Sequence, residues 1–146
     1  MVYSWKPGSY IRTDANVAGA MCAELSANGG LTAKRLLDAN RPEDAPLHSE
    51  FEWDDGIAAE KFRETQARHI INCLCIKAEG TEPVRQYFNI VKSEAEYKPL
   101  TAILRDPEDK VRLYDQVERE LKAIRKKYAA IEAFAKVWEA IDELGG

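Results

Sequence analysis

Four carboxylates lie close together near the middle of this sequence, and they are the first residues that could do chemistry. They are Glu50, Glu52, Asp54 and Asp55. Hard cations such as Mg²⁺ take oxygen ligands, so a magnesium site is one interpretation. A metal-dependent nuclease would also need a second acid-rich motif or a basic partner, and neither accompanies this cluster. We therefore interpret it as a solvated acidic loop that ends in a helix cap, and we predict no metal site.

One histidine and three cysteines form a second set with ligand chemistry, because zinc takes nitrogen and sulfur ligands. They are Cys22, His69, Cys73 and Cys75. Their spacing differs from that of a zinc knuckle, in which cysteines lie about two to four residues apart in a turn. Alternate residues of a strand share a face, so Cys73 and Cys75 are better explained as two small buried side chains. An odd number of cysteines also favours a reducing compartment over a disulfide framework.

The rest of the sequence gives no support for catalysis. His48 is predicted to make a hydrogen bond within its loop rather than to act as a base, and no nucleophile or glycine-rich phosphate loop has a recognisable setting. Apolar residues make up 45% and charged residues 32%, the mix of a folded soluble domain. The chain shows no signal peptide and no run long enough to cross a bilayer. We therefore expect a cytoplasmic, non-enzymatic protein without a cofactor.

A set of basic side chains could instead contact nucleic acid. The candidates are Lys34, Arg35, Lys61, Arg63 and Arg68, with Arg85 farther along. A recognition helix reads a groove through a few arginine, lysine, glutamine or asparagine side chains. However, the net charge is −4, and Glu60 and Glu64 lie among the candidates, which weakens attraction to phosphates. Arg63 and Arg68 could equally pair with the acids at 52–55 and hold that segment on a helix.

The elements that must position these residues are three short helices, a β-hairpin and a long C-terminal helix. The three short helices are predicted from Thr13 or Asp14 to 28–30, from Thr32 to the residue before Arg41, and over about 56–72. The strands are predicted at 73–78 and 84–91, followed by a connection at 93–106 and a final helix from Pro107. The first two helices resemble half of a helix-turn-helix, and the whole order is that of a winged helix and of many unrelated domains. We predict an α+β fold, mainly α, with residues 1–105 as a helix-turn-helix-like domain.

The segment between the second and third helices is predicted to be the scaffold of this domain. Its motif residues are His48, Phe51, Trp53, Asp54 and Asp55. Two prolines keep its first part extended or turned, and Asp54 or Asp55 is placed to cap the third helix and complement its dipole. Residues 1–12 are too rich in aromatics for a solvated tail, so we expect an ordered arm whose Trp5 and Tyr10 cover the core.

Residues 106–146 are predicted to form one long amphipathic helix that mediates oligomerisation. Asp106 is a suitable N-cap, with Pro107 at the first helical position. The apolar residues of this helix alternate steps of three and four, as in a heptad seam. The predicted interface consists of Tyr114, Val117, Leu121, Ile124, Tyr128, Ile131 and Trp138.

Charges beside this seam favour pairing with a second copy. Glu120 and Arg125, and likewise Lys127 and Glu132, have the separation of flanking charges that attract each other across a parallel coiled coil. Further apolar residues widen the stripe beyond a narrow seam, which suits a helix packed on a core. Self-association and packing across the domain are therefore both open.

A specific sequence pattern runs through the middle of the chain. It occupies Leu31–Ala39, Pro46–Asp55, Ala58–Glu60 and Arg63–Ile71. The pattern reads Pro-Leu-His, Phe-Glu-Trp-Asp-Asp, Ala-Ala, Arg and Gln-Ala-Arg, and it resembles proteins encoded in phages and prophages of Gram-positive bacteria. The resemblance covers residues 20–92 and brings no activity and no catalytic residue with it. It implies a phage-encoded binding protein that acts in the cytoplasm of a bacterial host.

Two functions remain open on the sequence. The first is a non-enzymatic DNA-binding protein of phage type that dimerises through its C-terminal helix. The second is a protein–protein adaptor, or an oligomeric phage component, that binds no nucleic acid. Charge on the folded surface discriminates them, because continuous basic surface over the second and third helices favours DNA and a mixed surface favours a protein partner.

Overall fold

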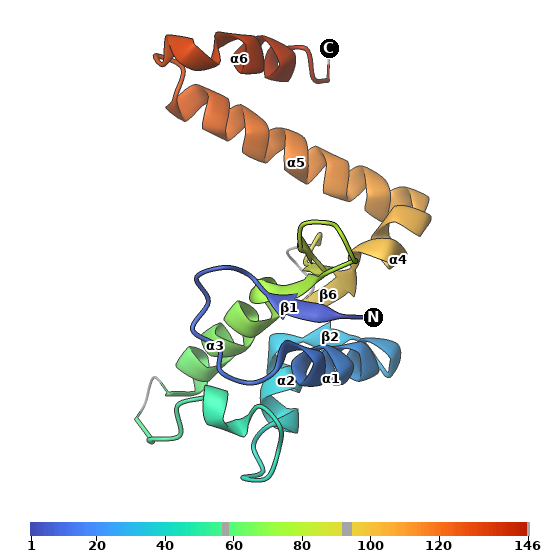
Figure 1. The fold of residues 1–146 in the computed structure, drawn as a ribbon, viewed down its shortest axis with the longest axis vertical. Helices are drawn as coiled ribbons and strands as arrows, with labels where there is room; N and C mark the ends of the chain where they lie inside the picture. The colour runs from blue at the N-terminus through green and yellow to red at the C-terminus, as the bar shows by residue number, and fades with distance from the viewer. Residues whose placement is uncertain (57–58, 92–94, 146) are drawn as a thin grey trace. The chain divides into compact units, whose positions relative to one another are not determined.

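The computed structural model describes residues 1–56, 59–91 and 95–145 and divides the chain into two compact units (Figure 1). Unit 1 is Met1–Ala102 and unit 2 is Ile103–Gly146. The described residues contain six α-helices and two small three-stranded antiparallel sheets, so the predicted α+β class, mainly α, is confirmed. Among these helices, none combines the length and the apolar character needed to span a bilayer.

The first sheet is built on the N-terminal arm. β1 (Tyr3–Trp5) pairs antiparallel with β3 (Leu74–Ile76), which in turn pairs with β4 (Val84–Arg85). The arm is ordered, as predicted, and Trp5 packs against the core. The prediction for Tyr10 is wrong, because its side chain is 93% exposed.

The second sheet shows why the predicted strand over 84–91 is wrong as a single element. Its strands, in order, are β2 (Leu31–Thr32), β6 (Glu96–Pro99) and β5 (Tyr87–Phe88). The chain changes sheets at the buried residue Gln86. The Gln86 amide donates to the Leu74 carbonyl at 3.2 Å, and its carbonyl accepts from the Leu100 amide at 2.8 Å. One residue therefore links both sheets, and β4 stays with β3 in the predicted hairpin.

Helices α1 (Ala15–Ala27) and α2 (Ala33–Ala39) begin where the capping residues predict. The side chains of Asp14 and Thr32 each accept a backbone amide hydrogen of the first helical turn, at 2.7 and 3.0 Å. Two glycines follow α1 with φ of 107° and 100°, a conformation that favours glycine and lets the chain turn directly into β2.

Helix α3 (Ala59–Cys73) packs against α2 and carries several of the candidate residues. Its first residue is Ala59 rather than about Gly56 as predicted, and Ile57 lies outside the described part of the chain. Of the two predicted caps, Asp55 pairs with Arg63 at 2.9 Å. The connector from Asn40 to α3, which contains the short 3₁₀ turn η1 (His48–Glu50), is much longer than the three- or four-residue turn of a helix-turn-helix. The core of unit 1 includes Leu31, Leu36, Leu37, Leu47, Phe51, Ala67, Ile70, Ile71, Leu74 and Tyr87.

The predicted continuous helix through residue 144 is wrong, because the chain reverses after α5. The last helices of the chain are α4 (Leu100–Arg105), α5 (Pro107–Lys127) and α6 (Ala135–Asp142). The 3₁₀ turn η2 (Glu132–Phe134) precedes α6. The cap of α5 is as predicted, since Asp106 accepts two amide hydrogens of the first turn. Arg125 bonds Asp142 at 2.9 Å, so α6 folds back along the second half of α5. The reversal buries Trp138 and Ile141, which a straight helix would expose.

Candidate functional site

Trp53 is the centre of the connector between α2 and α3. Its ring stacks on His48 with 4.5 Å between centroids and 6° between planes, and its Nε1 donates to the His48 carbonyl at 2.7 Å. The buried ring of Phe51 lies 5.9 Å away, and the guanidinium carbon of Arg63 lies 4.9 Å from the Trp53 centroid. A cation against an indole face is attracted to it, more strongly when water is excluded. These residues form one packed cluster that holds the connector on α3.

Asn40 anchors the start of the connector, and sequence reasoning missed it. Its side chain is fully buried; Oδ1 accepts from the Leu47 amide at 2.9 Å, and Nδ2 donates to the Leu36 carbonyl at 2.8 Å. The Asn40 carbonyl lies 2.9 Å from Nδ1 of His48. A buried amide satisfied on both sides fixes one geometry, because any other would leave a polar group without a partner. The asparagine directly after a short helix was the available signal.

The side chains of Glu50 and Gln66 form hydrogen bonds to other segments of unit 1. Glu50 Oε1 accepts from the amides of Arg12 and Thr13, at 2.9 and 2.8 Å, and from the Thr13 hydroxyl at 2.8 Å. Gln66 accepts from the Glu52 amide at 3.0 Å. The acid and the amide therefore tie the connector to the N-terminal arm on one side and to α3 on the other.

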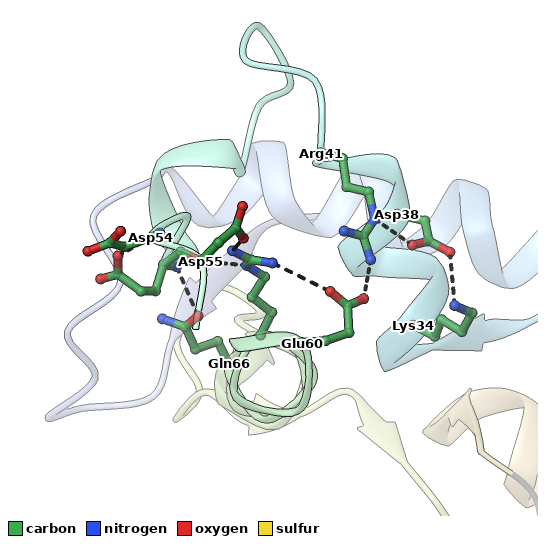
Figure 2. Close-up of polar contacts among 9 residues, drawn as sticks. Lys34, Asp38, Arg41, Asp54, Asp55, Glu60 and Gln66 are labelled. Atoms are coloured by element: carbon green, nitrogen blue, oxygen red, sulfur yellow. Dashed lines mark hydrogen bonds and ion pairs between the residues drawn. The ribbon is translucent and has the colours of Figure 1, made fainter. Parts of the chain in front are cut away.

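Acids and bases alternate along α2, the connector and α3 (Figure 2). The chain of contacts runs Lys34–Asp38 at 3.9 Å, Asp38–Arg41 at 2.8 Å, Arg41–Glu60, Glu60–Arg63 at 3.5 Å and Arg63–Asp55 at 2.9 Å. The hydrogen bond from Arg41 lowers the pKa of the Glu60 carboxyl, with a smaller lowering by Arg63. The surface over α2 and α3 is thus mixed in charge rather than continuously basic.

The predicted nucleic-acid residues divide into two groups. Arg35 donates to the carbonyls of Leu25 and Asn28, at 3.0 and 2.8 Å, and to that of Gly30, so it satisfies the C-terminal end of α1. Arg63 is buried against Trp53 and its Nε donates to the Glu52 carbonyl at 2.6 Å. Both are occupied within the protein. The exposed group is Lys34, Lys61 and Arg68.

Two of the exposed cations line a hollow of about 510 Å³. Lys34 of α2 and Arg68 of α3 line it, together with Asn89, which follows β5, and Tyr97 of β6. Glu64 lines it too and lies 3.6 Å from Arg68. The two cations that could meet a phosphate therefore share their hollow with a carboxylate.

The residues with metal-ligand chemistry do not assemble into a metal site in the described part of the chain. His69 and Cys73 are one helical turn apart, with the sulfur 3.6 Å from both ring nitrogens, and Cys75 lies in β3. Cys22 lies in the core instead, and burial raises the pKa of its thiol to about 12. None of the three cysteines forms a disulfide. Burial also raises the pKa of the Cys73 and Cys75 thiols, which keeps them protonated at neutral pH.

A larger hollow of about 610 Å³ lies between the N-terminal arm, the end of α3 and the β3–β4 hairpin. Lys6 and Arg85 contribute cations, and His69 and Asn72 contribute polar groups from α3. No carboxylate among the described residues lines it. This hollow differs in charge from the one beside Lys34. It is also lined by His69, Cys73 and Cys75, three of the four residues considered as zinc ligands from the sequence.

The predicted oligomer interface lies mostly on the surface of unit 2. Five of its members are exposed by 42–52%: Tyr114, Val117, Ile124, Tyr128 and Ile131. Leu121 is half-buried. Trp138 is buried, and its Nε1 donates to the Ile131 carbonyl at 3.2 Å across the turn between α5 and α6. The seam on α5 is therefore accessible, and Trp138 serves the fold of unit 2.

The comparisons with known proteins add no relative: no protein-family model, no curated protein and no solved structure matches this chain.

Proposed function

We propose that this protein is a non-enzymatic protein–protein interaction module whose unit 2 pairs with a second copy of the chain. One observation carries the proposal. Between positions 111 and 137, unit 2 leaves eight large apolar side chains 42–58% exposed: Val111, Tyr114, Val117, Ile124, Tyr128, Ile131, Phe134 and Val137. Of these, Tyr114, Val117 and Ile124 of α5 and its C-cap Tyr128 recur at helical spacing and share one face. Exposed apolar residues on one helix face mark an interaction surface, because covering them removes apolar area from water.

The charges of α5 favour a second copy as the occupant and favour an antiparallel arrangement. Residues 107–118 contain four acids and two bases, a net charge of −2, whereas residues 119–127 contain five bases and one acid, a net charge of +4. Two antiparallel α5 helices place each acidic half beside a basic half, and a parallel pair would align like charges. The charge pair Lys127 and Glu132, which favoured a parallel coiled coil in the sequence, is not available within one helix. Glu132 lies in η2, beyond the end of α5.

An Ile124→Asp variant should be monomeric at concentrations at which the parent chain is a dimer. A carboxylate at the centre of an apolar interface must be desolvated without a partner, which should weaken association about 100-fold or more. Sedimentation equilibrium over a range of protein concentrations measures the change. Ala123→Asp is the matched control, since it adds the same charge at the neighbouring exposed position, outside the predicted seam. A monomeric parent chain, or equal loss in both variants, would reject self-association through this face.

The distance between spin labels attached to a Lys127→Cys variant distinguishes the antiparallel dimer from the parallel one. Because a helix rises about 1.5 Å per residue, labels near the end of α5 should lie about 30 Å apart in an antiparallel pair and about 10 Å apart in a parallel one. If the labels lie at the shorter distance, the chain self-associates but the antiparallel arrangement is wrong. The native thiols are all buried, which leaves the introduced cysteine as the accessible one.

A second candidate function is binding of duplex DNA, supported by the three exposed cations on α2 and α3. If it is correct, Lys34→Gln and Arg68→Gln should each weaken binding several-fold, and the parent's affinity should fall steeply as salt rises, because phosphate contacts release counterions. Fluorescence anisotropy on a labelled duplex at two salt concentrations measures both effects. We rank this function second because Asp38 and Glu64 pair with these cations. Absence of binding at low salt would remove it.

A further inference from the structure

We propose that the hollow between the N-terminal arm, α3 and the β3–β4 hairpin binds the phosphate group of a small molecule. The hollow measures about 610 Å³, and it brings Lys6 from the arm and Arg85 from β4 to the same site. Both residues carry a positive charge at neutral pH. The proposal concerns unit 1 alone and does not depend on how unit 2 associates.

The absence of a lining carboxylate distinguishes this hollow from the one beside Lys34, which Glu64 also lines. Arg41, Arg63 and Arg68 each pair with a carboxylate. In contrast, neither Lys6 nor Arg85 forms an ion pair with a carboxylate within the described residues, and no acid of that part lines the hollow. Two cations in a concave site without a counter-charge create a positive potential that an anion can neutralise.

The guanidinium of Arg85 is held in place before any ligand arrives. Its Nε donates to the Tyr87 carbonyl at 2.9 Å, one terminal nitrogen donates to Asn72 Oδ1 at 2.7 Å, and its carbon lies 4.7 Å from the centroid of Phe88. A side chain fixed by three contacts loses little entropy when it binds, and a planar guanidinium matches the geometry of phosphate oxygens.

A tight turn of the arm forms another part of the hollow. The Lys6 amide donates to the Cys73 carbonyl at 2.8 Å, and the Ser9 amide donates to the Lys6 carbonyl at 3.1 Å. Gly8 has a φ of 88°, which lets the chain reverse there at no steric cost. Lys6 and Ser9 both line the hollow. The backbone thus fixes the lysine beside the end of α3, and a hydroxyl joins it at the rim.

The two cations affect the pKa of two thiols that line the hollow. Although burial raises the pKa of the Cys73 and Cys75 thiols, the charges of Lys6 and Arg85 act in the opposite direction on each of them. All four residues line the hollow. His69, exposed and next to Cys73, adds a nitrogen that can donate to a phosphate oxygen.

Titration of the ¹⁵N-labelled full chain with inorganic phosphate at constant ionic strength tests the proposal. The amide signals of Lys6, Gly8, Ser9, residues 72–75 and Arg85 should shift and saturate, and a phosphate monoester should shift the same signals. Acetate serves as the anion without phosphate geometry and should bind more weakly.

Lys6→Gln should weaken phosphate binding about 10-fold, since a charge-assisted contact is lost. Lys77→Gln is the matched control, because it removes the same charge from an exposed lysine of unit 1 outside the hollow. Arg85→Lys keeps the charge, loses the fork of donors and should also weaken binding. Shifts that do not saturate, or equal weakening in Lys6→Gln and Lys77→Gln, would overturn the proposal.

Discussion

Replacing Arg63 by alanine should lower the free energy of unfolding by about 3 kcal/mol, a large share of the stability of a small domain. The side chain of Arg63 is only 7% exposed, and its Nε donates to the Glu52 carbonyl at 2.6 Å. Its guanidinium also lies over Trp53. The variant would lose a charge-assisted hydrogen bond and the packing of a long side chain at once. Urea unfolding followed by tryptophan fluorescence measures the loss.

Arg68→Ala provides the matched control on the same helix. The Arg68 side chain is half-exposed, and its one ion pair, with Glu64, spans 3.6 Å. Exposed pairs of this kind contribute little, so the control should change the free energy of unfolding by less than about 0.5 kcal/mol. The Asp55 carboxylate is 89% exposed, so most of the Arg63 effect should persist in an Asp55→Asn background. Similar losses in Arg63→Ala and Arg68→Ala would show that the connector does not depend on Arg63.

Local capping chemistry made the helix starts predictable. Asp14, Thr32 and Asp106 act within one turn of their own position, and each has the polar side chain that an unsatisfied amide requires. The same locality explains the partial success at the hairpin, where β3 and β4 flank a turn that contains Gly80. Signals that act between near neighbours survive in the sequence alone.

The reversal after Lys127 was not predictable from periodicity. The heptad steps continue through Tyr128 and Ile131, and the residues between them, two alanines, contain no helix breaker. What favours the turn is burial of Trp138 and Ile141 by the folded-back chain. A repeat of three and four residues describes which side chains share a face, and it holds equally for one long helix and for two shorter ones.

Pairing between distant segments was the other missing information. β6 joins β2 across more than half of unit 1, and Thr32, one of the two residues of β2, is also the N-cap of α2. Strands this short have no alternation to detect. The connector was different, because its residue types already indicated a packed and charge-paired segment. It contains two aromatic residues beside acids, and Arg63 and Arg68 of the next helix could pair with those acids.

Asn40→Asp should be the most damaging isosteric change in unit 1, with an expected loss of about 4 kcal/mol in the free energy of unfolding at neutral pH. The replaced Nδ2 donates to the Leu36 carbonyl at 2.8 Å, so an oxygen there would face another acceptor in a fully buried position. The new carboxylate must either stay charged without water or take up a proton. Chemical denaturation at neutral pH measures the cost, and the loss should shrink at acidic pH as the carboxyl becomes neutral.

Asn16→Asp separates this effect from the chemistry of the substitution itself. Asn16 is exposed in the first turn of α1, where its Oδ1 accepts from the Tyr3 amide at 2.9 Å. A carboxylate keeps that acceptor and complements the positive end of the helix dipole, so stability should stay equal or rise by a few tenths of a kcal/mol, roughly. The same exchange of one amide for one carboxylate thus has opposite consequences at the two positions. Equal and small effects at both would mean that the Asn40 amide does not fix the start of the connector.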